Sequence, residues 1–349
     1  MELKFVGIEA WEAASNERID VPEDRYTLTD GSGAKFSILP GLTLHRDLTI
    51  LGTDWIPVRR DGTSALDQMT HRPESFIGKA RNFEQRDGRF FVTAARRRRL
   101  DGSALLVGGH ANYYHWLIDY VPRLLYAERH GEFLDSRRLL TNAQRTPAQR
   151  EVLDLLGICA DRLIEVEPDE AVTIAEVCVP NMLAASSVVH PLVPELLREA
   201  LPPRDSRPGR RIYLSRQDAP TRQLVNEEAL TQLLDRYGFE RLVPGRMRVQ
   251  DQIDACASAE AMVAVHGAAM ANLVFCPPHA RVIEIFTPGH AASYFLILAH
   301  VCGLAHQFSP ASVVDRQAGR TDLHHHWEVD LAALESILRT IGSGYVAAR

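Results

Sequence analysis

The sequence lacks two short motifs that hold phosphates or cations in many proteins. It has no Asp-x-Asp pair, and no Gly-x-Gly-x-x-Gly follows any expected strand. Without the first motif there is no ready carboxylate site for Mg²⁺ or Mn²⁺, and without the second a dinucleotide-dependent enzyme is not favoured. Three consecutive histidines, His324 to His326, cannot share one face of a regular element. We interpret them as a surface loop, and we predict no metal site.

Cysteine pairs, excess basic charge and long apolar runs are also missing. The five cysteines are odd in number and form no Cys-x-x-Cys pair, which favours a reducing compartment without structural zinc. The net charge of −6 argues against a nucleic-acid partner. Met1 to Glu9 has no signal-peptide pattern, and the apolar run Tyr294 to Leu304 is far shorter than the ~20 residues of a membrane-spanning helix. We therefore expect a cytoplasmic protein.

The composition is that of a globular α/β protein large enough for two domains. The chain has 349 residues, 46% of them hydrophobic and 24% charged. Short β-like runs fill the first 100 residues, and strands alternate with helices afterwards, which predicts parallel sheets. A Pro- and Arg-rich linker spans 202–209. We predict a β-rich segment at 1–100, serving as a lead-in or for oligomerisation, and doubly wound α/β domains at 101–204 and 205–349.

The stretch 261–286 carries the first candidate site. Ala261 to Val265 predicts a buried strand that ends at His266-Gly267, and the small residues from Ala268 onward predict a short helix. The start of a helix attracts anions. A phosphate is therefore expected beside Gly267 and Ala268, with His266 as an added donor. A purely structural His-Gly turn is the alternative.

Two further residues of that stretch fit a nucleotide site. Asn272, at the end of the small-residue segment, is a second candidate donor. Glu284 lies near the end of the next apolar strand, Arg281 to Phe286, where a carboxylate suits ribose hydroxyls. Upstream, Arg216 and Arg222 follow the strand Arg211 to Leu214 and precede a helix. Because guanidinium groups offer bidentate donors, we predict that this pair binds a diphosphate.

A second candidate site lies on the expected helix after Gly108-Gly109. His115 and Asp119 are four residues apart and so share one helix face, and aromatic residues surround them. Pro122 should bend the helix or end its first segment. The pair either stabilises the helix or supplies a general base, and we favour the second interpretation because buried charged pairs usually have a function.

The motifs resemble those of the family-61 glycosyltransferases, which include bacterial capsular-polysaccharide enzymes and plant xylan arabinosyl- and xylosyltransferases. The resemblance covers about Leu105 to Phe308 and is most specific from Arg211 to Phe286. It rests on three segments, RRIYLSRQDAPTRQLVNEEAL, GFERLVPGRMRVQDQIDACASAEAMVAVHGAAMANLVF and RVIEIFTP, and on an N-terminal signature of Asn112, His115-Trp116, Asp119 and Pro122-Arg123-Leu124.

The resemblance implies a GT-B fold, in which two Rossmann-like domains face a cleft, a nucleotide-sugar donor such as a UDP-sugar, and inversion at the anomeric carbon. Asp119 or His115 would be the base, Arg216 would stabilise the leaving group, and Asn112 and Arg123 would contact a glycan or polysaccharide acceptor. Because the chain lacks Asp-x-Asp, we expect transfer without a metal or other cofactor. Peripheral membrane association and homo-oligomers are further partner hypotheses.

Two other classes of protein compete with this interpretation. A different sugar-nucleotide enzyme on a Rossmann-like fold is disfavoured by the missing Gly-x-Gly-x-x-Gly. A catalytically silent nucleotide-binding scaffold would bind nucleoside diphosphates without turning over a donor. The donor sugar, the acceptor and the linkage depend on pocket contacts that no motif in the sequence specifies.

Overall fold

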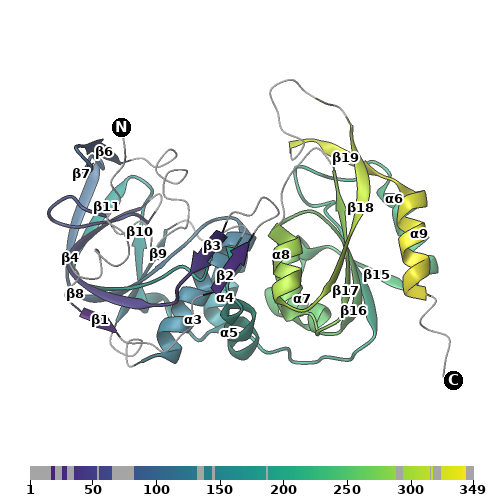
Figure 1. Ribbon diagram of the computed structural model, residues 1–349, viewed down its shortest axis with the longest axis horizontal. Coiled ribbons are helices and arrows are strands. Elements are labelled where there is room, and N and C mark those ends of the chain that lie inside the picture. The colour runs from purple at the N-terminus through teal and green to yellow at the C-terminus, as the bar shows by residue number, and fades with distance from the viewer. Residues whose placement is uncertain are drawn as a thin grey trace. The chain divides into compact units, whose positions relative to one another are not determined.

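The structure is a computed structural model that describes residues 17–19, 26–29, 35–52, 55–64, 82–131, 137–143, 146–185, 188–287, 294–314, 316 and 324–342 (Figure 1). The chain divides into two compact units, residues 1–200 and 201–349. Each unit has its own sheet with parallel strands, so the protein is of the mixed α/β class.

The N-terminal unit is built on one sheet with the strand order β1-β4-β11-β8-β9-β10, and β5 pairs with β4. Strands β11, β8, β9 and β10 are parallel where they pair, whereas β4 is antiparallel to both β11 and β1. The strands are β1 (Glu17–Ile19), β4 (Leu42–Leu51), β5 (Pro57–Val58), β8 (Arg96–Gly108), β9 (Arg138–Asn142), β10 (Leu163–Val166) and β11 (Glu170–Pro180).

Strand β4 changes the expected role of the first 100 residues. It pairs with β11 from Leu42 opposite Pro180 to Leu51 opposite Ala171, and Leu42, Leu48, Ile50 and Leu51 are buried. The β-rich segment predicted as a lead-in or for oligomerisation therefore contributes an antiparallel strand to the sheet that was predicted to be parallel. The partner of β4 lies far along the chain, so the local pattern around β4 could not reveal the pairing.

The described part of the N-terminal unit also contains helices and small two-stranded sheets. The helices are α3 (Val121–Arg129), α4 (Pro147–Leu155) and α5 (Leu192–Ala200), with the short helical segments η2 (His115–Tyr120) and η3 (Ala160–Arg162). The small sheets pair β2 (Tyr26–Thr29) with β3 (Lys35–Ile38), β6 (Phe83–Arg86) with β7 (Arg89–Val92), and β12 (Ala184–Ala185) with β13 (Val188–Val189). Helix α4 begins with a capping box between Thr146 and Gln149.

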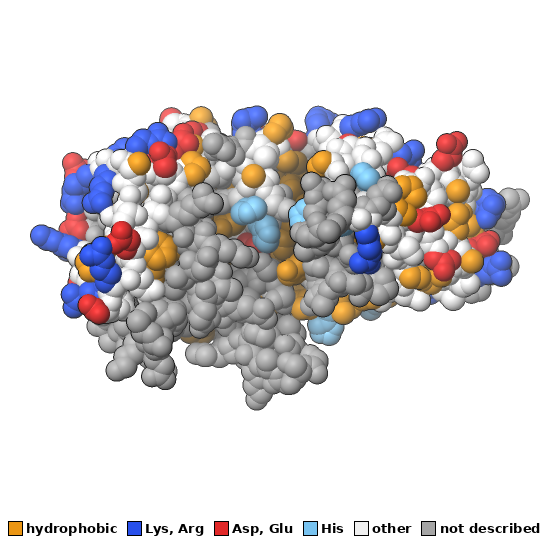
Figure 2. All heavy atoms as spheres, turned by 90° about the horizontal axis from the view of Figure 1, so that it is seen from above, with side chains coloured by type: hydrophobic (Ala, Val, Ile, Leu, Met, Phe, Trp, Pro, Cys, Tyr) orange, Lys and Arg blue, Asp and Glu red, His pale blue; other side chains and the backbone are white. Residues whose placement is uncertain are grey.

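Three of the four arginines at the start of β8 pair with acidic side chains, and the fourth, Arg97, donates to the backbone carbonyl of Val92. Arg96 pairs with Asp169, Arg98 with Glu170 at 2.9 Å and Arg99 with Asp47 at 2.5 Å. Figure 2 shows basic and acidic side chains side by side at the end of the molecule where β6, β7 and β8 lie in Figure 1. Arg96, Arg98 and Arg99 therefore belong to surface ion pairs.

The C-terminal unit has a doubly wound sheet with the strand order β15-β14-β16-β17-β18-β19, parallel except for the antiparallel β19. The strands are β14 (Arg210–Leu214), β15 (Phe239–Leu242), β16 (Ala259–Val265), β17 (Arg281–Phe286), β18 (Ala305–Val314) and β19 (His326–Val329). The helical segments are α6 (Glu227–Arg236), η4 (Pro244–Arg246), α7 (Val249–Ala257), η5 (Ala268–Phe275), α8 (Tyr294–Val301) and α9 (Leu331–Gly342). His326 thus begins a strand, not the loop expected for the three histidines.

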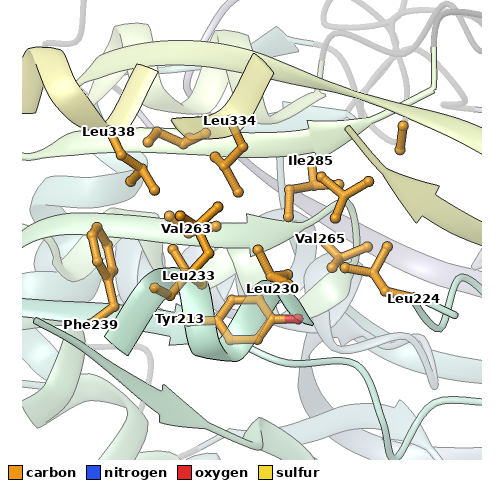
Figure 3. Packing of buried hydrophobic residues seen from close by; sticks show 14 of the residues in the cluster. Tyr213, Leu224, Leu230, Leu233, Phe239, Val263, Val265, Ile285, Leu334 and Leu338 are labelled. Carbon is orange, nitrogen blue, oxygen red and sulfur yellow. The ribbon is translucent and has the colours of Figure 1, made fainter. Parts of the chain in front are cut away.

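The core of this unit lies between the sheet and helices α6 and α9. Figure 3 shows Leu230 and Leu233 of α6 and Leu334 and Leu338 of α9 packed over Val263, Val265 and Ile285 of the central strands. Successive strand residues alternate between the two faces of a sheet, so Ala264 and Glu284 face the opposite side, where α7, η5 and α8 lie. Among the described residues, no helix is both long and apolar enough to cross a bilayer.

Candidate functional site

The strand order of the C-terminal unit fixes where a ligand can bind. The chain leaves β14 toward β15 on one side, and then continues from β16 to β17 on the other side. In open α/β sheets, ligands bind at the carboxyl ends of the strands where the winding reverses. Arg216 follows β14 and His266-Gly267 follows β16, so these predicted donor residues flank that position.

Gly267 and Arg216 are in close steric contact. A Cβ atom on residue 267 would lie 1.8 Å from Nη1 of Arg216, so a residue with a side chain would displace the guanidinium group. Arg216 donates from Nη2 to the carbonyl oxygen of Thr221 at 3.2 Å, and its buried Nε has no hydrogen-bond partner among the described residues. The guanidinium group is thus held against the start of η5 with donor capacity to spare.

Arg222 adds a second guanidinium group beside the first. Its backbone has a φ of 58°, which is unusual for a side chain of this size, and its N–H donates to the carbonyl oxygen of His325 at 2.9 Å. Its Nε is also buried without a hydrogen-bond partner among the described residues. Burial, and then the neighbouring charge of Arg216, lower the pKa of Arg222 to about 10. Two adjacent cations with unused donors form a site for an anion.

A hydrogen-bonded network lies at the end of β14, next to Arg216 in the sequence. Glu227, in the first turn of α6, accepts hydrogen bonds from Tyr213 Oη at 2.8 Å and from Ser215 Oγ at 2.5 Å. Its other oxygen lies 3.2 Å from the guanidinium group of Arg241. Sequence reasoning did not assign this role to Glu227. Its place at a helix N-terminus next to the arginines was the available signal.

His266 and Glu284 belong to a second buried cluster, which His306 of β18 completes. Nδ1 of His266 lies 2.5 Å from Oε1 of Glu284, and Nε2 of His306 lies 2.8 Å from Oε2. Burial alone would raise the pKa of Glu284, but the hydrogen bonds from the two histidines outweigh it and lower the pKa. Both carboxylate oxygens are therefore engaged and the residue is 1% exposed, which argues against the expected contact with ribose hydroxyls. Glu284 instead orients His266.

The position of Asn272 also argues against a contact with the nucleotide-sugar donor. Its side chain is buried between η5 and α7 and donates from Nδ2 to Oε1 of Gln252 at 2.8 Å. It therefore fixes η5 against α7. Ala268 remains half-buried at the start of η5, and the first N–H groups of a helix have no partner within that helix. The phosphate position expected beside Gly267 and Ala268 stays a prediction.

The second candidate site lies on η2 in the N-terminal unit. This segment is a π-helix, a rare form that often occurs at functional sites, and the α-helix α3 takes over from it at Val121. Pro122 has no N–H for the carbonyl of Ile118, and the π-helical segment ends at Tyr120, just before it, while the backbone stays helical into α3. The wider π-helical turns lie just before the proline, in η2.

His115 and Asp119 form a hydrogen-bonded pair on this segment. Nδ1 of His115 lies 2.7 Å from Oδ2 of Asp119, and the side chains are 33% and 6% exposed. Burial lowers the pKa of His115, but the hydrogen bond and charge of Asp119 outweigh it, so the pKa is raised. The carboxylate is at the back of the site and the imidazole is at the surface. This order is that of a base oriented by an acid.

The two predicted acceptor residues differ in position. Asn112 is exposed, and its Oδ1 accepts the N–H of Tyr114 at 2.9 Å, so it caps the start of the helix. Arg123 is fully buried and donates to the carbonyl oxygens of Pro180 and Val107 at 2.8 and 3.2 Å. Burial lowers the pKa of Arg123 to about 10. Arg123 therefore ties α3 to β8 and β11, and its burial argues against an acceptor contact.

His110 is a residue at this site that sequence reasoning did not select. It follows β8 in the glycine-containing turn, is exposed, and lies with its ring centroid 4.7 Å from that of His115. The glycine pair before it was the available signal. The site thus presents two imidazoles in edge-to-face contact, with Asp119 behind one of them.

One comparison with known proteins gives a match. Residues 113–283 match the family described as Glycosyltransferase 61. The matched segment begins two residues before His115 and includes Asp119, Arg216, Arg222 and His266. No curated protein matches the chain.

Proposed function

Since the chain belongs to glycosyltransferase family 61, we propose that it transfers a sugar, with inversion, from a nucleoside diphosphate donor, most simply a UDP-sugar, to a hydroxyl group of a glycan or polysaccharide. The observation that carries the proposal is the pair of guanidinium groups of Arg216 and Arg222 at the reversal point of the sheet, with unused donors beside the start of η5. A diphosphate has the charge and the oxygens to occupy that position.

In the proposed reaction, His115 is the base. Its Nε2 takes the proton of the acceptor hydroxyl while the oxygen attacks the anomeric carbon. The bond from that carbon to the diphosphate oxygen breaks, and the electron pair passes to the leaving diphosphate. Arg216 and Arg222 stabilise the added charge, and His266 is oriented by Glu284 to assist. Asp119 holds the tautomer of His115 and stabilises the imidazolium that forms.

The assignment of the base to His115 over Asp119 follows from access. An acceptor hydroxyl must come within hydrogen-bond reach of the base. The carboxylate of Asp119 is nearly inaccessible, and one of its oxygens already binds His115. The imidazole side chain is 33% exposed, and because Nδ1 is engaged with Asp119, Nε2 is the nitrogen left for the acceptor.

The proposal extends to the wider setting of the reaction. It includes a GT-B arrangement of two domains, transfer without a metal ion or cofactor, a cytoplasmic location and peripheral association with a membrane or with a second copy of the chain. No group of three His, Cys, Asp or Glu side chains within the described part of the chain is placed to hold a metal ion. Metal independence remains a prediction to be tested with a chelator.

The test is calorimetric titration of UDP into the wild type and into Arg216→Ala and Arg222→Ala. Each substitution removes charge-assisted hydrogen bonds, so binding should weaken by ~1.5–3 kcal/mol. Arg236→Ala is the matched control, because Arg236 is exposed on α6 with a side chain 63% exposed. Equal affinities in all four proteins would remove the arginines from the donor site. UDP binding without donor turnover by the wild type would favour the silent scaffold.

A further inference from the structure

The backbone that carries His110 is held from three sides. Gly108 has a φ of 83°, and a Cβ atom there would lie 2.7 Å from the ring of Tyr120. A Cβ atom on Gly109 would lie 1.9 Å from Oδ1 of Asn142. Nε1 of Trp55 donates to the carbonyl oxygen of Gly109 at 2.8 Å, and Nε2 of Gln149 donates to that of His110 at 3.0 Å. His110 is thus mounted on a preorganised turn, as a binding residue needs to be.

The hydrogen bonds of the two imidazoles set opposite tautomers. Nδ1 of His110 accepts the backbone N–H of Asn112 at 2.9 Å, so the proton of the neutral ring is on Nε2. Nδ1 of His115 donates to Asp119, so its Nε2 is an acceptor. Among the described residues, neither Nε2 has a hydrogen-bond partner. One ring therefore presents a donor and its neighbour presents an acceptor.

The charges of the groups around His110 support this assignment. Shielding of its ring from water, and then the neighbouring His115, lower the pKa of His110. A lowered pKa favours the neutral ring, and the hydrogen bond at Nδ1 places its single proton on Nε2. His115 and Asp119 are the two titratable groups that act on it.

Resting on the function proposed above, we propose that His110 determines acceptor specificity. Its Nε2–H donates to the oxygen next to the attacking hydroxyl, while Nε2 of His115 accepts from that hydroxyl. The acceptor class that satisfies both imidazoles is a sugar with two adjacent hydroxyl groups. One hydroxyl donates its proton to Nε2 of His115, and the oxygen of the neighbouring hydroxyl accepts from Nε2–H of His110. An acceptor with a lone hydroxyl leaves the donor of His110 unmatched.

The experiment measures transfer to a panel of methyl pyranosides and to the monodeoxy derivatives that lack one neighbouring hydroxyl. A hydrogen bond of ordinary strength corresponds to about a tenfold preference for the diol in kcat/KM. In His110→Phe the ring remains but the donor is lost, so this preference should fall to about one, mainly through KM. His110→Gln keeps an N–H near the position of Nε2 and should retain most of the preference.

His115→Gln and Arg236→Ala are the comparison variants. The first should lose turnover with every acceptor, and the second should behave as the wild type. A full diol preference in a folded His110→Phe, or loss of all turnover in both His110 variants, would overturn the assignment of His110. Failure of the wild type to transfer sugar from any donor would instead overturn the proposed function and the inference with it.

Discussion

Replacing Gly267 with alanine should weaken donor binding without harming the fold. The backbone at Gly267 is extended, with φ of 171° and ψ of 169°, a conformation that alanine also adopts. The new methyl group, however, would lie 1.8 Å from Nη1 of Arg216. The guanidinium group must therefore move by more than an ångström, because a non-bonded carbon contact needs about 3.5 Å. The anion site loses the donor geometry of Arg216 while the sheet stays intact.

The magnitude follows from the bond that is lost. A hydrogen bond to a charged group contributes about 1.5–3 kcal/mol, so the Kd for UDP should rise by roughly 10- to 150-fold. Calorimetric titration measures that change, and a denaturant titration of the same protein checks its stability. We expect the midpoint of unfolding to remain close to that of the wild type.

A double-mutant cycle separates this mechanism from general damage. In an Arg216→Ala background no guanidinium group remains to be displaced, so adding Gly267→Ala should cause almost no further loss of affinity. Full additivity of the two changes would refute the steric argument. So would a Gly267→Ala variant that binds UDP as tightly as the wild type.

Three further results are expected. Asp119→Asn should lower kcat by ~10²–10⁴-fold with donor affinity unchanged. Because Asp119 raises the pKa of His115, the same variant should shift the acidic limb of the pH–rate profile to lower pH. His115→Ala should lower kcat at least as much, and near-wild-type turnover in both variants would make the pair structural. Transfer should persist in excess EDTA, and activity lost to EDTA and regained with Mn²⁺ would contradict a metal-free reaction. Glu284→Gln should reduce the free energy of unfolding at neutral pH by ~1–3 kcal/mol, whereas substitution of the exposed Glu228 by Gln should not. Because the pKa of Glu284 is depressed in the folded protein, its contribution to stability is present above the ordinary value of 4.5 and is lost as pH falls through the folded pKa. Equal pH profiles of stability in the wild type and Glu284→Gln would contradict this prediction.

The local elements of the fold were largely predictable from the sequence. The strand at Arg281–Phe286 has the predicted bounds, because it has a clear apolar pattern and breaking residues beside it. Strand β18 was not predicted. Its sequence, AHQFSPASVV, includes a proline and several polar residues, and pairing with β17 and β19 overrides that weak local preference.

The candidate site was predictable in position but less so in the roles of its residues. The order of strands and turns placed Arg216 and His266 at strand ends, and strand ends converge in any doubly wound sheet. Arg123, Asn272 and Glu284 were chosen for their chemistry, yet the structure buries each of them among partners from distant segments. His110 was missed for the same reason, since its contact with His115 depends on a turn fixed by Trp55 and Asn142.

The pairing of β4 with β11 has a consequence for the order in which the protein assembles. Residues on β4 such as Leu42 and Ile50 are made early on the ribosome, but their partners Pro180 and Val172 follow only after β8, β9 and β10. The apolar strand must wait with an unpaired edge, which is the condition under which chains aggregate. Strands β14, β15, β16 and β17 instead meet partners that are near in sequence, and contacts of that kind form faster. The half of the chain that is synthesised first is therefore expected to complete its sheet more slowly than the second, and to depend more on chaperones.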